Sequence, residues 1–251
     1  MSLQNELNDI TVLSLEQAVA APYCGMLLAD AGARVIKVER PEGDFARAYD
    51  SGADGKSSIF AWLNRGKESI CLNINENSDK DLLSKMIAKS DIFLSNLAPG
   101  TLSKKGFSAE LIRKLNKKII NCSISGYGSR NISSNNKAYD FLIQGETGLC
   151  SVTGTAEYPS KVGISVTDIS TGLTAFSAIL RGLIQRNKNG KGVDIEISMF
   201  DVIADWMNMP LMAHRYGNGA PKRMALSHSF VAPYGAFETL DEKKILISIQ
   251  N

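Results

Sequence analysis

A strand, a helix and a second strand follow one another within the first 40 residues, and this succession constrains the fold most. The segment "ITVLSL" (10–15) is an apolar, β-branched run typical of a buried strand. A short helix is predicted over "PYCGMLLADAG", with Pro22 in its first turn and Gly32 past its end. The second strand is "ARVIKVE" (33–39). Such a βαβ unit implies a parallel sheet with right-handed crossovers.

The same alternation continues along the chain. Strands are predicted over "SICLNI", "DIFLSNL", "IINCSIS" and "VDIEIS", and helices over "SDKDLLSKMIAKS" and "SAELIRKLNKK". From Ile169 onward, apolar residues spaced three and four apart predict a long helix that ends at "RNKNGKG". The fold class predicted is α/β: a Rossmann-like open, mostly parallel sheet with flanking helices, followed by the start of a small second domain. In such sheets ligands bind beyond the carboxyl ends of the strands, in loops such as "EQAVAAP", "RPEGDFAR" and "NLAPGTLSKKG".

The last third of the chain predicts a change of domain. Ser198 and Asp201 resemble a capping box that opens one helix over "MFDVIADWMNMPLMAHRYG". The aperiodic "GNGAPKRMALSHSFVAPYG" that follows is predicted to be a linker, and "FETLDEKKILISI" a β-hairpin. We therefore expect a large domain over residues 1–215 and a linker with the beginning of a small domain over 216–251. Because a domain rarely ends directly after a hairpin, we expect this chain to be the N-terminal part of a longer protein.

Charge and composition disfavour several classes of protein. The 28 Lys and Arg nearly balance the 26 Asp and Glu, so the chain lacks the excess of positive charge that is typical of nucleic-acid-binding proteins. Two histidines and four cysteines without a C-x-x-C pair give poor support to a metal site and favour reduced thiols in the cytoplasm. The N-terminus is polar and acidic, unlike a signal peptide, and no apolar run approaches the ~20 residues that a membrane span needs. The fingerprint G-x-G-x-x-G is absent from the first turn, which disfavours NAD and FAD.

One aspartate, Asp168, stands where the extended segment "VGISV" gives way to the long helix. An Asp at a helix N-terminus commonly caps the free N–H groups of the first turn. A carboxylate held there can also act as a nucleophile toward an activated acyl carbon, because the helix dipole stabilises its charge. Position alone leaves both interpretations open.

Segments over almost the whole chain, in the right order, resemble the class III CoA-transferases, the family of formyl-CoA transferase and carnitine CoA-transferase. They are "VLSLEQAVAAPYCGMLLADAGARVIKVERPEGDFAR", "NRGKESICLNI", "SDIFLSNLAPGTLSKKGFSAELIRKLNKKIINCSISGYG", "AYDFLIQGETGL" and "VTDISTGLTAFSAILRGLIQRNKNGKGVDIEISMFD". The resemblance implies an acyl-CoA:carboxylate CoA-transferase in which Asp168 is the nucleophile. It implies an aspartyl anhydride and an aspartyl-CoA thioester as covalent intermediates. Coenzyme A and acyl-CoA enter as substrates, and no prosthetic group is needed.

The resemblance also carries over a set of CoA-binding positions. Arg40 matches an arginine that meets the nucleotide phosphates, and Lys104 stands where the family has another arginine, without its bidentate geometry. The remaining positions are Val19, Ala20, Leu72, Asn73, Ile74, Asn75, Asn96, Leu97, Ala98, Lys137, Ala138, Tyr139 and Asp140. Gln17 and His228 are predicted to face the acyl group or the acceptor acid. "EQAVAAP" and "HSFVAPYGAFET" resemble the branch that handles dicarboxylates, so succinyl-CoA or another dicarboxylyl-CoA is the expected donor.

Two alternatives stay open. The same superfamily contains α-methylacyl-CoA racemases, which carry His-Asp where this chain has Tyr139 and Asp140. Because the unperturbed pKa of tyrosine is near ~10, Tyr139 matches that proton shuttle poorly. The chain could also be a non-catalytic CoA-binding fragment if further residues are needed for the site. The family forms interlocked dimers, so we expect a homodimer that binds acyl-CoA and a small carboxylic acid, and neither nucleic acid nor membrane.

Overall fold

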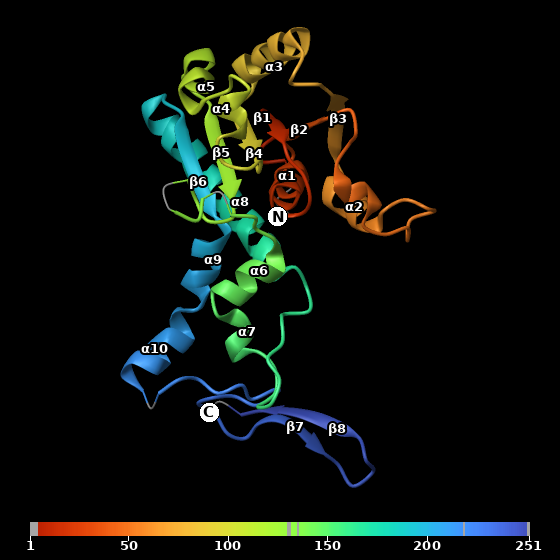
Figure 1. The fold of residues 1–251 in the computed structure, drawn as a ribbon, viewed down its shortest axis with the longest axis vertical. Coiled ribbons are helices and arrows are strands. Elements are labelled where there is room, and N and C mark those ends of the chain that lie inside the picture. Colours follow the sequence, from red (N-terminus) through yellow and green to blue (C-terminus); the bar gives the residue numbers. More distant parts are fainter. Residues whose placement is uncertain (1–4, 130–131, 135, 218, 250–251) are drawn as a thin grey trace. The chain divides into compact units, whose positions relative to one another are not determined.

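The structure is a computed structural model that describes residues 5–129, 132–134, 136–217 and 219–249. The chain divides into two compact units, each built of two segments that come together in space (Figure 1). The first unit comprises Met1–Ala138 and Thr167–Val202, and the second comprises Tyr139–Val166 and Ile203–Asn251. The predicted division into residues 1–215 and 216–251 stays a prediction.

The first unit is built on a six-stranded sheet in the order β3-β2-β1-β4-β5-β6. Its strands are β1 Thr11–Leu15, β2 Arg34–Glu39, β3 Lys67–Cys71, β4 Ile92–Ser95, β5 Ile120–Ser125 and β6 Val193–Ser198. Every neighbouring pair is parallel. This is the strand order of the Rossmann fold, so the predicted open, parallel α/β sheet is confirmed.

Helices flank this sheet, and four of them match predicted segments. They are α1 Ala20–Asp30, α3 Asn77–Lys89, α5 Ala109–Leu115 and α8 Val166–Asn189. Three shorter elements, η1 Phe45–Ala48, α2 Ser58–Asn64 and α4 Thr101–Lys104, were not predicted. Two of them begin with side-chain caps, from Asp44 to the Ala46 amide and from Ser57 to the Phe60 amide. The two elements of four residues, η1 and α4, are too short to show a 3.6-residue periodicity, so the sequence pattern does not reveal them.

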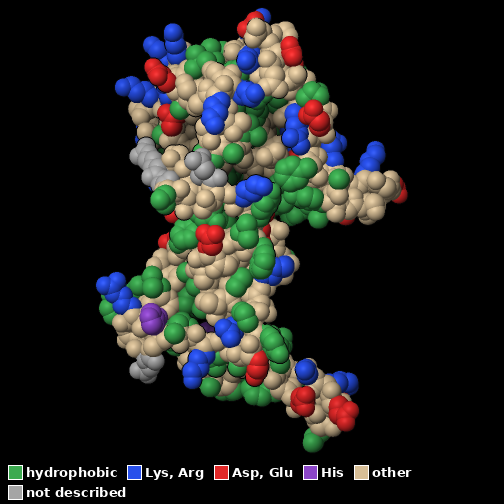
Figure 2. Space-filling model, in the orientation of Figure 1, with side chains coloured by type: hydrophobic (Ala, Val, Ile, Leu, Met, Phe, Trp, Pro, Cys, Tyr) green, Lys and Arg blue, Asp and Glu red, His purple; other side chains and the backbone are tan. Residues whose placement is uncertain are grey.

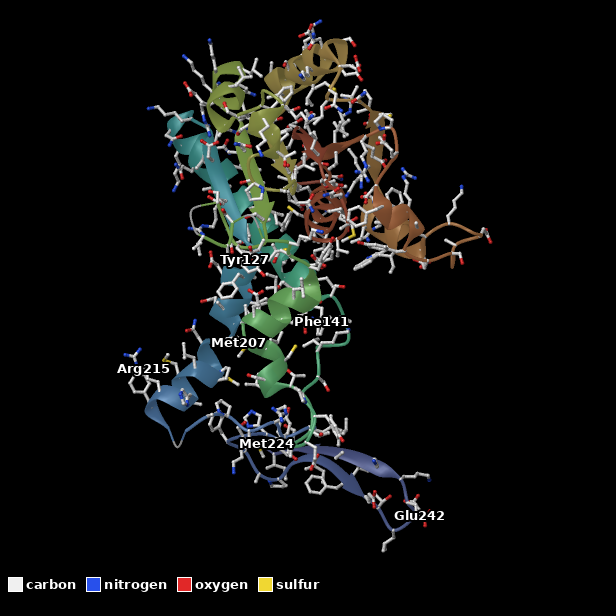
Figure 3. The ribbon with its side chains drawn as sticks, in the orientation of Figure 1. Tyr127, Phe141, Met207, Arg215, Met224 and Glu242 are labelled. Atoms are coloured by element: carbon white, nitrogen blue, oxygen red, sulfur yellow. The ribbon has the colours of Figure 1, made fainter. Side chains whose placement is uncertain are left out.

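The structure corrects four of the predicted element boundaries. Helix α1 begins at Ala20 rather than Pro22, and β3 ends at Cys71 rather than at Ile74. Helix α8 begins at Val166, so Asp168 is its third residue and not its cap. The single helix predicted after Ser198 is two helices, α9 Met199–Trp206 and α10 Asn208–Tyr216, separated at Met207 (Figure 3). Pro210 explains this break, because proline has no N–H for an intrahelical bond and is tolerated only in the first turn of a helix.

The core of the first unit lies on both faces of the sheet. Helices α3 and α5 contribute Leu83, Ile87 and Ile112 to a cluster with Leu13 and Phe93 of the central strands, all at most 2% exposed. Burying each such side chain contributes about 1.5–3 kcal/mol. Helix α8 packs closely on the sheet as well, since a Cβ added at Gly182 would lie 3.1 Å from Cγ1 of Val193 and 3.2 Å from Cγ2 of Ile120. A sheet covered in this way is rigid enough to position loops at its carboxyl edge.

The second unit contains α6 Asp140–Glu146, α7 Leu149–Val152, α10, and a two-stranded antiparallel sheet of β7 Tyr234–Glu238 and β8 Lys244–Ser248. The predicted hairpin is therefore confirmed, with Glu242 near its tip at a φ of 58° (Figure 3). The described residues between α10 and β7 form no helix or strand, as expected of the predicted linker. Arg223 ties this segment to the loop after α7, since its guanidinium donates to the carbonyl oxygens of Thr155 and Ala156, both at 2.8 Å.

On the face of the molecule shown in Figure 2, Lys and Arg side chains are interspersed with Asp and Glu. No large field of one sign covers that face. This distribution agrees with the near-balanced charge of the chain. Among the described residues, no helix combines the length and the apolar character that crossing a membrane requires.

Candidate active site

The strand order reverses between β1 and β4, and two residues at the carboxyl ends of these strands are tied together there. The amide N–H of Gln17 donates to Oδ1 of Asn96 at 2.9 Å, and Nδ2 of Asn96 donates back to the Gln17 carbonyl at 2.8 Å. In open α/β sheets the point where the strand order reverses is the usual place for a ligand. This edge of the sheet is therefore the expected place for a ligand-binding site.

A cavity of about 440 Å³ opens at this edge, over the carboxyl ends of β1, β2 and β3. Seven of the predicted site residues line it: Gln17, Arg40, Leu72, Asn73, Ile74, Asn75 and Leu97. They come from four different loops, far apart in the sequence. The size of the cavity is within the range of small-molecule and cofactor sites.

The backbone of the loop after β3 is held in place by its own side chains. Asn73 donates its amide N–H to Oδ2 of Asp79 in the first turn of α3, at 2.8 Å. The side-chain oxygen of Asn73 accepts the amide N–H of Asn75 at 3.1 Å. Because the Asn73 amide is already engaged, a ligand in the cavity meets mainly the carbonyl oxygens and side chains of this loop.

Two positive side chains line the cavity, and one of them was missed by the sequence analysis. Arg40 donates to the Gly43 carbonyl at 3.0 Å and lies 3.8 Å from Glu42. Lys105 donates to Oδ1 of Asn75, whereas the predicted Lys104 is exposed and does not line the cavity. The signal that identifies Lys105 is its spacing: Thr101 also lines the cavity, and residues four apart share one face of a helical turn.

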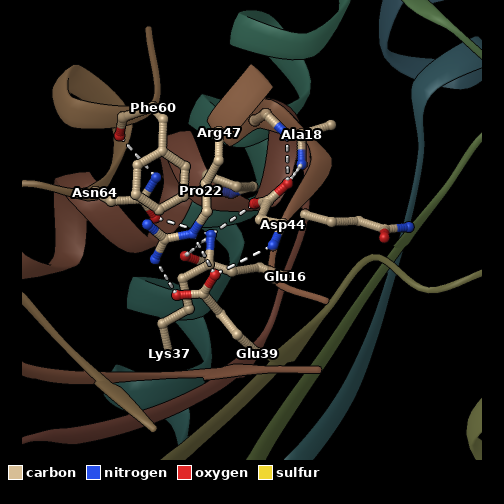
Figure 4. A network of polar contacts seen from close by, with 12 residues as sticks. Glu16, Ala18, Pro22, Lys37, Glu39, Asp44, Arg47, Phe60 and Asn64 are labelled. Atoms are coloured by element: carbon tan, nitrogen blue, oxygen red, sulfur yellow. Dashed lines mark hydrogen bonds and ion pairs between the residues drawn. The ribbon is translucent and has the colours of Figure 1, made fainter. Parts of the chain in front are cut away.

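Beneath the cavity lies a buried network of charged side chains that the sequence did not indicate (Figure 4). Lys37, in the middle of β2, is 1% exposed and donates to Asp44 at 2.7 Å and to Asn64 at 2.9 Å. Lys67 of β3 pairs with Glu16 and donates to the Pro22 carbonyl at 2.9 Å. Each buried cation therefore has an acidic partner, as low-dielectric surroundings require. A lysine inside the apolar strand "RVIKVE" is the feature of the sequence that could have pointed to this network.

Burial and pairing act in opposite directions on the pKa values of Glu39 and Lys67 in this network. Burial would raise the pKa of Glu39, but hydrogen bonds from Arg47, Ser69 and the Asp44 amide outweigh it and lower that pKa to about 2. The guanidinium of Arg47 also lies over the ring of Phe60, 4.0 Å from its centroid. Burial lowers the pKa of the Lys67 ammonium, and the attraction of Glu16 opposes that change. The network is thus a fixed support under the cavity floor.

Asp168 lies on the face of α8 that meets the first turn of α1. A Cβ added at Gly172 would come within 2.5 Å of the Ala20 carbonyl oxygen, so the two backbones nearly touch. Asp168 is half-buried and precedes Gly172 by four residues, which places both on one face of the helix. The segment from Gln17 to Ala20 therefore lines the cavity at one end and approaches the Asp168 face of α8 at the other. Val19 and Ala20 belong to this segment without lining the cavity itself.

The other predicted residues lie elsewhere. Asn96 and Ala98 flank the cavity residue Leu97, and Asn96 is engaged with Gln17. Lys137 is exposed, and Ala138 packs against Gly126, where an added Cβ would lie 2.0 Å from the Ala138 methyl.

Tyr139, Asp140 and His228 belong to the second unit and are described within it. Tyr139 precedes α6 and is 61% exposed, and Asp140 accepts a hydrogen bond from Gln144 at 2.7 Å. The His228 ring packs on Tyr234, with 4.9 Å between centroids, and its Nδ1 accepts the Phe230 amide N–H. Their roles stay predictions.

Within the described part of the chain, no three His, Cys, Asp or Glu side chains gather in a way that could hold a metal ion. The chemistry available at the site is that of a carboxylate on a helix and of a cavity whose lining includes two cations.

The sequence and the fold resemble those of known proteins. The sequence is 33% identical to the acetyl-CoA:oxalate CoA-transferase of Acetobacter aceti, over 95% of this chain and 62% of that protein. It is 35% identical to the succinyl-CoA:glutarate CoA-transferase of Mus musculus, over 94% of this chain and 55% of that protein. A crystal structure of a CAIB/BAIF family protein from Brucella suis superposes with a TM-score of 0.90 at 33% identity, covering 98% of this chain and 66% of that one.

The chain thus spans 55–62% of the length of these two curated relatives. The profile of one family, described as CoA-transferase family III, matches residues 7–251, which is nearly the whole sequence. The chain belongs to CoA-transferase family III.

Proposed function

We propose that this chain is the large-domain part of an acyl-CoA:carboxylate CoA-transferase, with Asp168 as the nucleophile. The observation that carries the proposal is the Gln17–Ala20 segment, which joins the cavity at the switch point to the face of α8 that bears Asp168. Membership of the family and the names of the two relatives support the reaction class. Both relatives are named for dicarboxylates, so we propose succinyl-CoA or another dicarboxylyl-CoA as donor and a small dicarboxylate as acceptor.

The proposed reaction proceeds through two kinds of covalent intermediate on Asp168. Its carboxylate attacks the thioester carbon of the donor, the C–S bond breaks, and an acyl-aspartyl anhydride and the CoA thiolate form. The thiolate attacks the aspartyl carbonyl of the anhydride, which releases the donor acid and leaves an aspartyl-CoA thioester. The acceptor carboxylate then displaces the thiolate to give a second anhydride. Attack of the thiolate on the acceptor acyl carbon forms the new acyl-CoA and restores Asp168.

The first turn of α8 suits this chemistry. Asp168 is its third residue, where the helix dipole stabilises the carboxylate and, later, the negative charge on nearby oxygens. The cavity would take the CoA moiety, with Arg40 and Lys105 opposite its phosphates. Glu16, Glu39 and Asp44 are neutralised by buried or half-buried cations, so they do not repel a polyanionic ligand.

The proposal includes a homodimer in the cytoplasm. Large apolar side chains that are about half exposed in the second unit, among them Trp206, Met209 and Leu211, support an association that covers them. The buried free thiols of Cys24 and Cys122 suit a reducing compartment.

The test is chemical trapping at Asp168. The protein is incubated with succinyl-CoA, quenched with hydroxylamine and digested, and the peptide that contains Asp168 is analysed for the hydroxamate by mass spectrometry. We expect the label on Asp168 and its loss in Asp168→Asn. The matched control is Asp201→Asn, because Asp201 is the third residue of α9 and has no proposed role. A label that survives Asp168→Asn would refute the nucleophile, and CoA binding without any label would favour a CoA-binding module instead.

A further inference from the structure

The turn between β1 and α1 contains a residue in an unfavourable conformation. Ala18 has a φ of 63°, in the left-handed region that a residue with a Cβ rarely occupies. Such a conformation persists only when the surroundings impose it, and it is concentrated at functional sites. The turn follows Gln17 of the cavity and precedes the segment that meets the Asp168 face of α8.

Side chains from two other loops impose this conformation. Asn96 holds Gln17 by its amide and its carbonyl, as described above. Oδ1 of Asp44 accepts the amide N–H of Ala18 at 3.1 Å (Figure 4). The two successive amides of the turn therefore point at two fixed acceptors, and neither is available to a ligand.

Asp44 is itself fixed by three further hydrogen bonds. It is 5% exposed, its Oδ1 also accepts the Ala46 amide at 3.0 Å, and its Oδ2 accepts Nζ of Lys37 at 2.7 Å. Its own amide donates to Oε2 of Glu39 at 3.1 Å, and Glu39 is held in turn by Arg47. Because Lys37 is buried in the sheet, Asp44 cannot turn to solvent without leaving that cation unpaired. Lys37 and Asp44 thus connect the turn to the rigid sheet by two successive hydrogen bonds.

We infer that Asp44 is a positioning residue, which fixes the strained Gln17–Ala18 turn so that the cavity and the nucleophile of α8 keep one geometry. The expected loss of kcat rests on the proposed function. The expected effect of Asp44 on the conformation of the turn does not. The inference assigns a role in the reaction to a residue that acts through the backbone of the Gln17–Ala18 turn.

The test combines Asp44→Asn with Ala18→Gly, because glycine adopts a positive φ without a steric penalty. We expect Asp44→Asn to speed hydrogen exchange of the Ala18 amide and to lower kcat by about 10- to 100-fold, since small misplacements near a reacting group have effects of that size. The Kd for CoA should change by less than about threefold, because the lost interaction acts on orientation rather than on ground-state binding. In the double variant Ala18→Gly/Asp44→Asn, kcat should rise above that of Asp44→Asn, because glycine adopts the conformation of the turn without the Asp44 acceptor.

A role of Asp44 that is only structural predicts a different pattern. The melting temperature of Asp44→Asn falls under either role, because buried Lys37 loses its acidic partner. If the role is only structural, Ala18→Gly does not restore kcat. That pattern, or unchanged exchange at Ala18, would overturn the inference. If Asp44→Asn does not fold, Lys37→Met/Asp44→Asn removes both buried charges together and gives the same readouts. If the wild-type protein transfers no CoA at all, the proposed function is wrong. Hydrogen exchange of the Ala18 amide in the wild type and in Asp44→Asn then tests whether Asp44 positions the turn.

Discussion

Gly172 of α8 and the carbonyl oxygen of Ala20 in α1 approach each other so closely that a Cβ added at Gly172 would lie 2.5 Å from that oxygen. The same Cβ would lie 3.0 Å and 3.1 Å from two carbon atoms of Tyr23. A glycine inside a helix is unfavourable by about 1 kcal/mol relative to alanine, so its presence here reflects the need for backbone contact. That contact sets the distance between the proposed nucleophile, one helical turn earlier, and the turn that lines the cavity.

Gly172→Ala is expected to separate α8 from α1 and to displace Asp168 from its partners. We predict that kcat/KM for CoA transfer falls by about 100-fold, an effect that a displacement of roughly 1 Å produces near a reacting group. Gly182→Ala is the matched control in the same helix, because its Cβ would meet only side-chain carbons, at 3.1 Å and more. Steady-state kinetics and melting temperatures of both variants are the measurement. Equal loss of activity in the two variants would show that general destabilisation, and not this contact, is responsible.

Adjacent lysines 104 and 105 are predicted to differ in CoA binding. Lys105 lines the cavity and binds Asn75, whereas Lys104 is exposed and does not line the cavity. Lys105→Ala should weaken CoA binding by about tenfold, which is 1.4 kcal/mol, and reduce its sensitivity to salt. Lys104→Ala should leave the Kd within about twofold of the wild-type value. Isothermal titration at two salt concentrations measures both, and the reverse order of effects would contradict the placement of Lys105.

Much of the fold follows from local patterns that this sequence displays clearly. The alternation of β-branched runs with amphipathic segments gave the strands, the long helices and the parallel sheet, since the period of each element is a local property. The family resemblance, not the pattern, singled out Asp168 and the loop residues. Seven of these residues do line one cavity, because parallel strands bring the loops at their carboxyl ends together.

The parts that could not be predicted depend on long-range contacts. The network of Glu16, Lys37, Asp44 and Lys67 joins two strands and two loops, and no local pattern encodes which buried charges will pair. The left-handed conformation of Ala18 is imposed by side chains 26 and 78 residues away, so the residue type at this position does not predict it. The choice of Lys105 over Lys104 depends on where a four-residue helix points, which periodicity over so few residues cannot fix.

Gly25 of α1 is predicted to be required by the buried carboxylate of Glu16. A Cβ at this position would lie 2.7 Å from Oε2 of Glu16 and 3.1 Å from Nζ of Lys67. Both side chains are at most 2% exposed and paired with each other, so neither has room to withdraw. We expect Gly25→Ala to lower the free energy of unfolding by about 1–3 kcal/mol, the usual cost of overpacking a core.

The control for Gly25 is Gly145→Ala in α6, where an added Cβ would meet no atom within 4 Å. That change should stabilise the protein by up to about 1 kcal/mol, which is the ordinary preference of a helix for alanine over glycine. Urea denaturation followed by circular dichroism measures both variants. A Gly25→Ala variant as stable as Gly145→Ala would show that the Glu16 and Lys67 side chains can move aside without lowering the free energy of unfolding.

Glu39 is predicted to make stability depend on acid pH. The pKa of Glu39 in the folded protein is about 2, below the value of about 4.3 for an unfolded glutamate. Its contribution to stability is therefore complete above pH ~5 and is lost as the pH falls through 4 toward 2. Glu39→Gln should cost about 1–2 kcal/mol at pH 7, reduced from the full linkage value because Arg47 is half-exposed and screened, and almost nothing near pH 2.

The matched control for Glu39 is Glu68→Gln, since Glu68 also pairs with an arginine, Arg34, but both side chains are more than half exposed. Solvent screens such a pair, so its removal should change stability by at most about 0.5 kcal/mol at any pH. Urea midpoints of the wild type and the two variants, measured from pH 7 down to pH 2, test the prediction. Either a deficit of Glu39→Gln that persists at pH 2, or a deficit of Glu68→Gln of the same size at pH 7, would show that burial of Glu39 among Arg47, Ser69 and the Asp44 amide is not the cause.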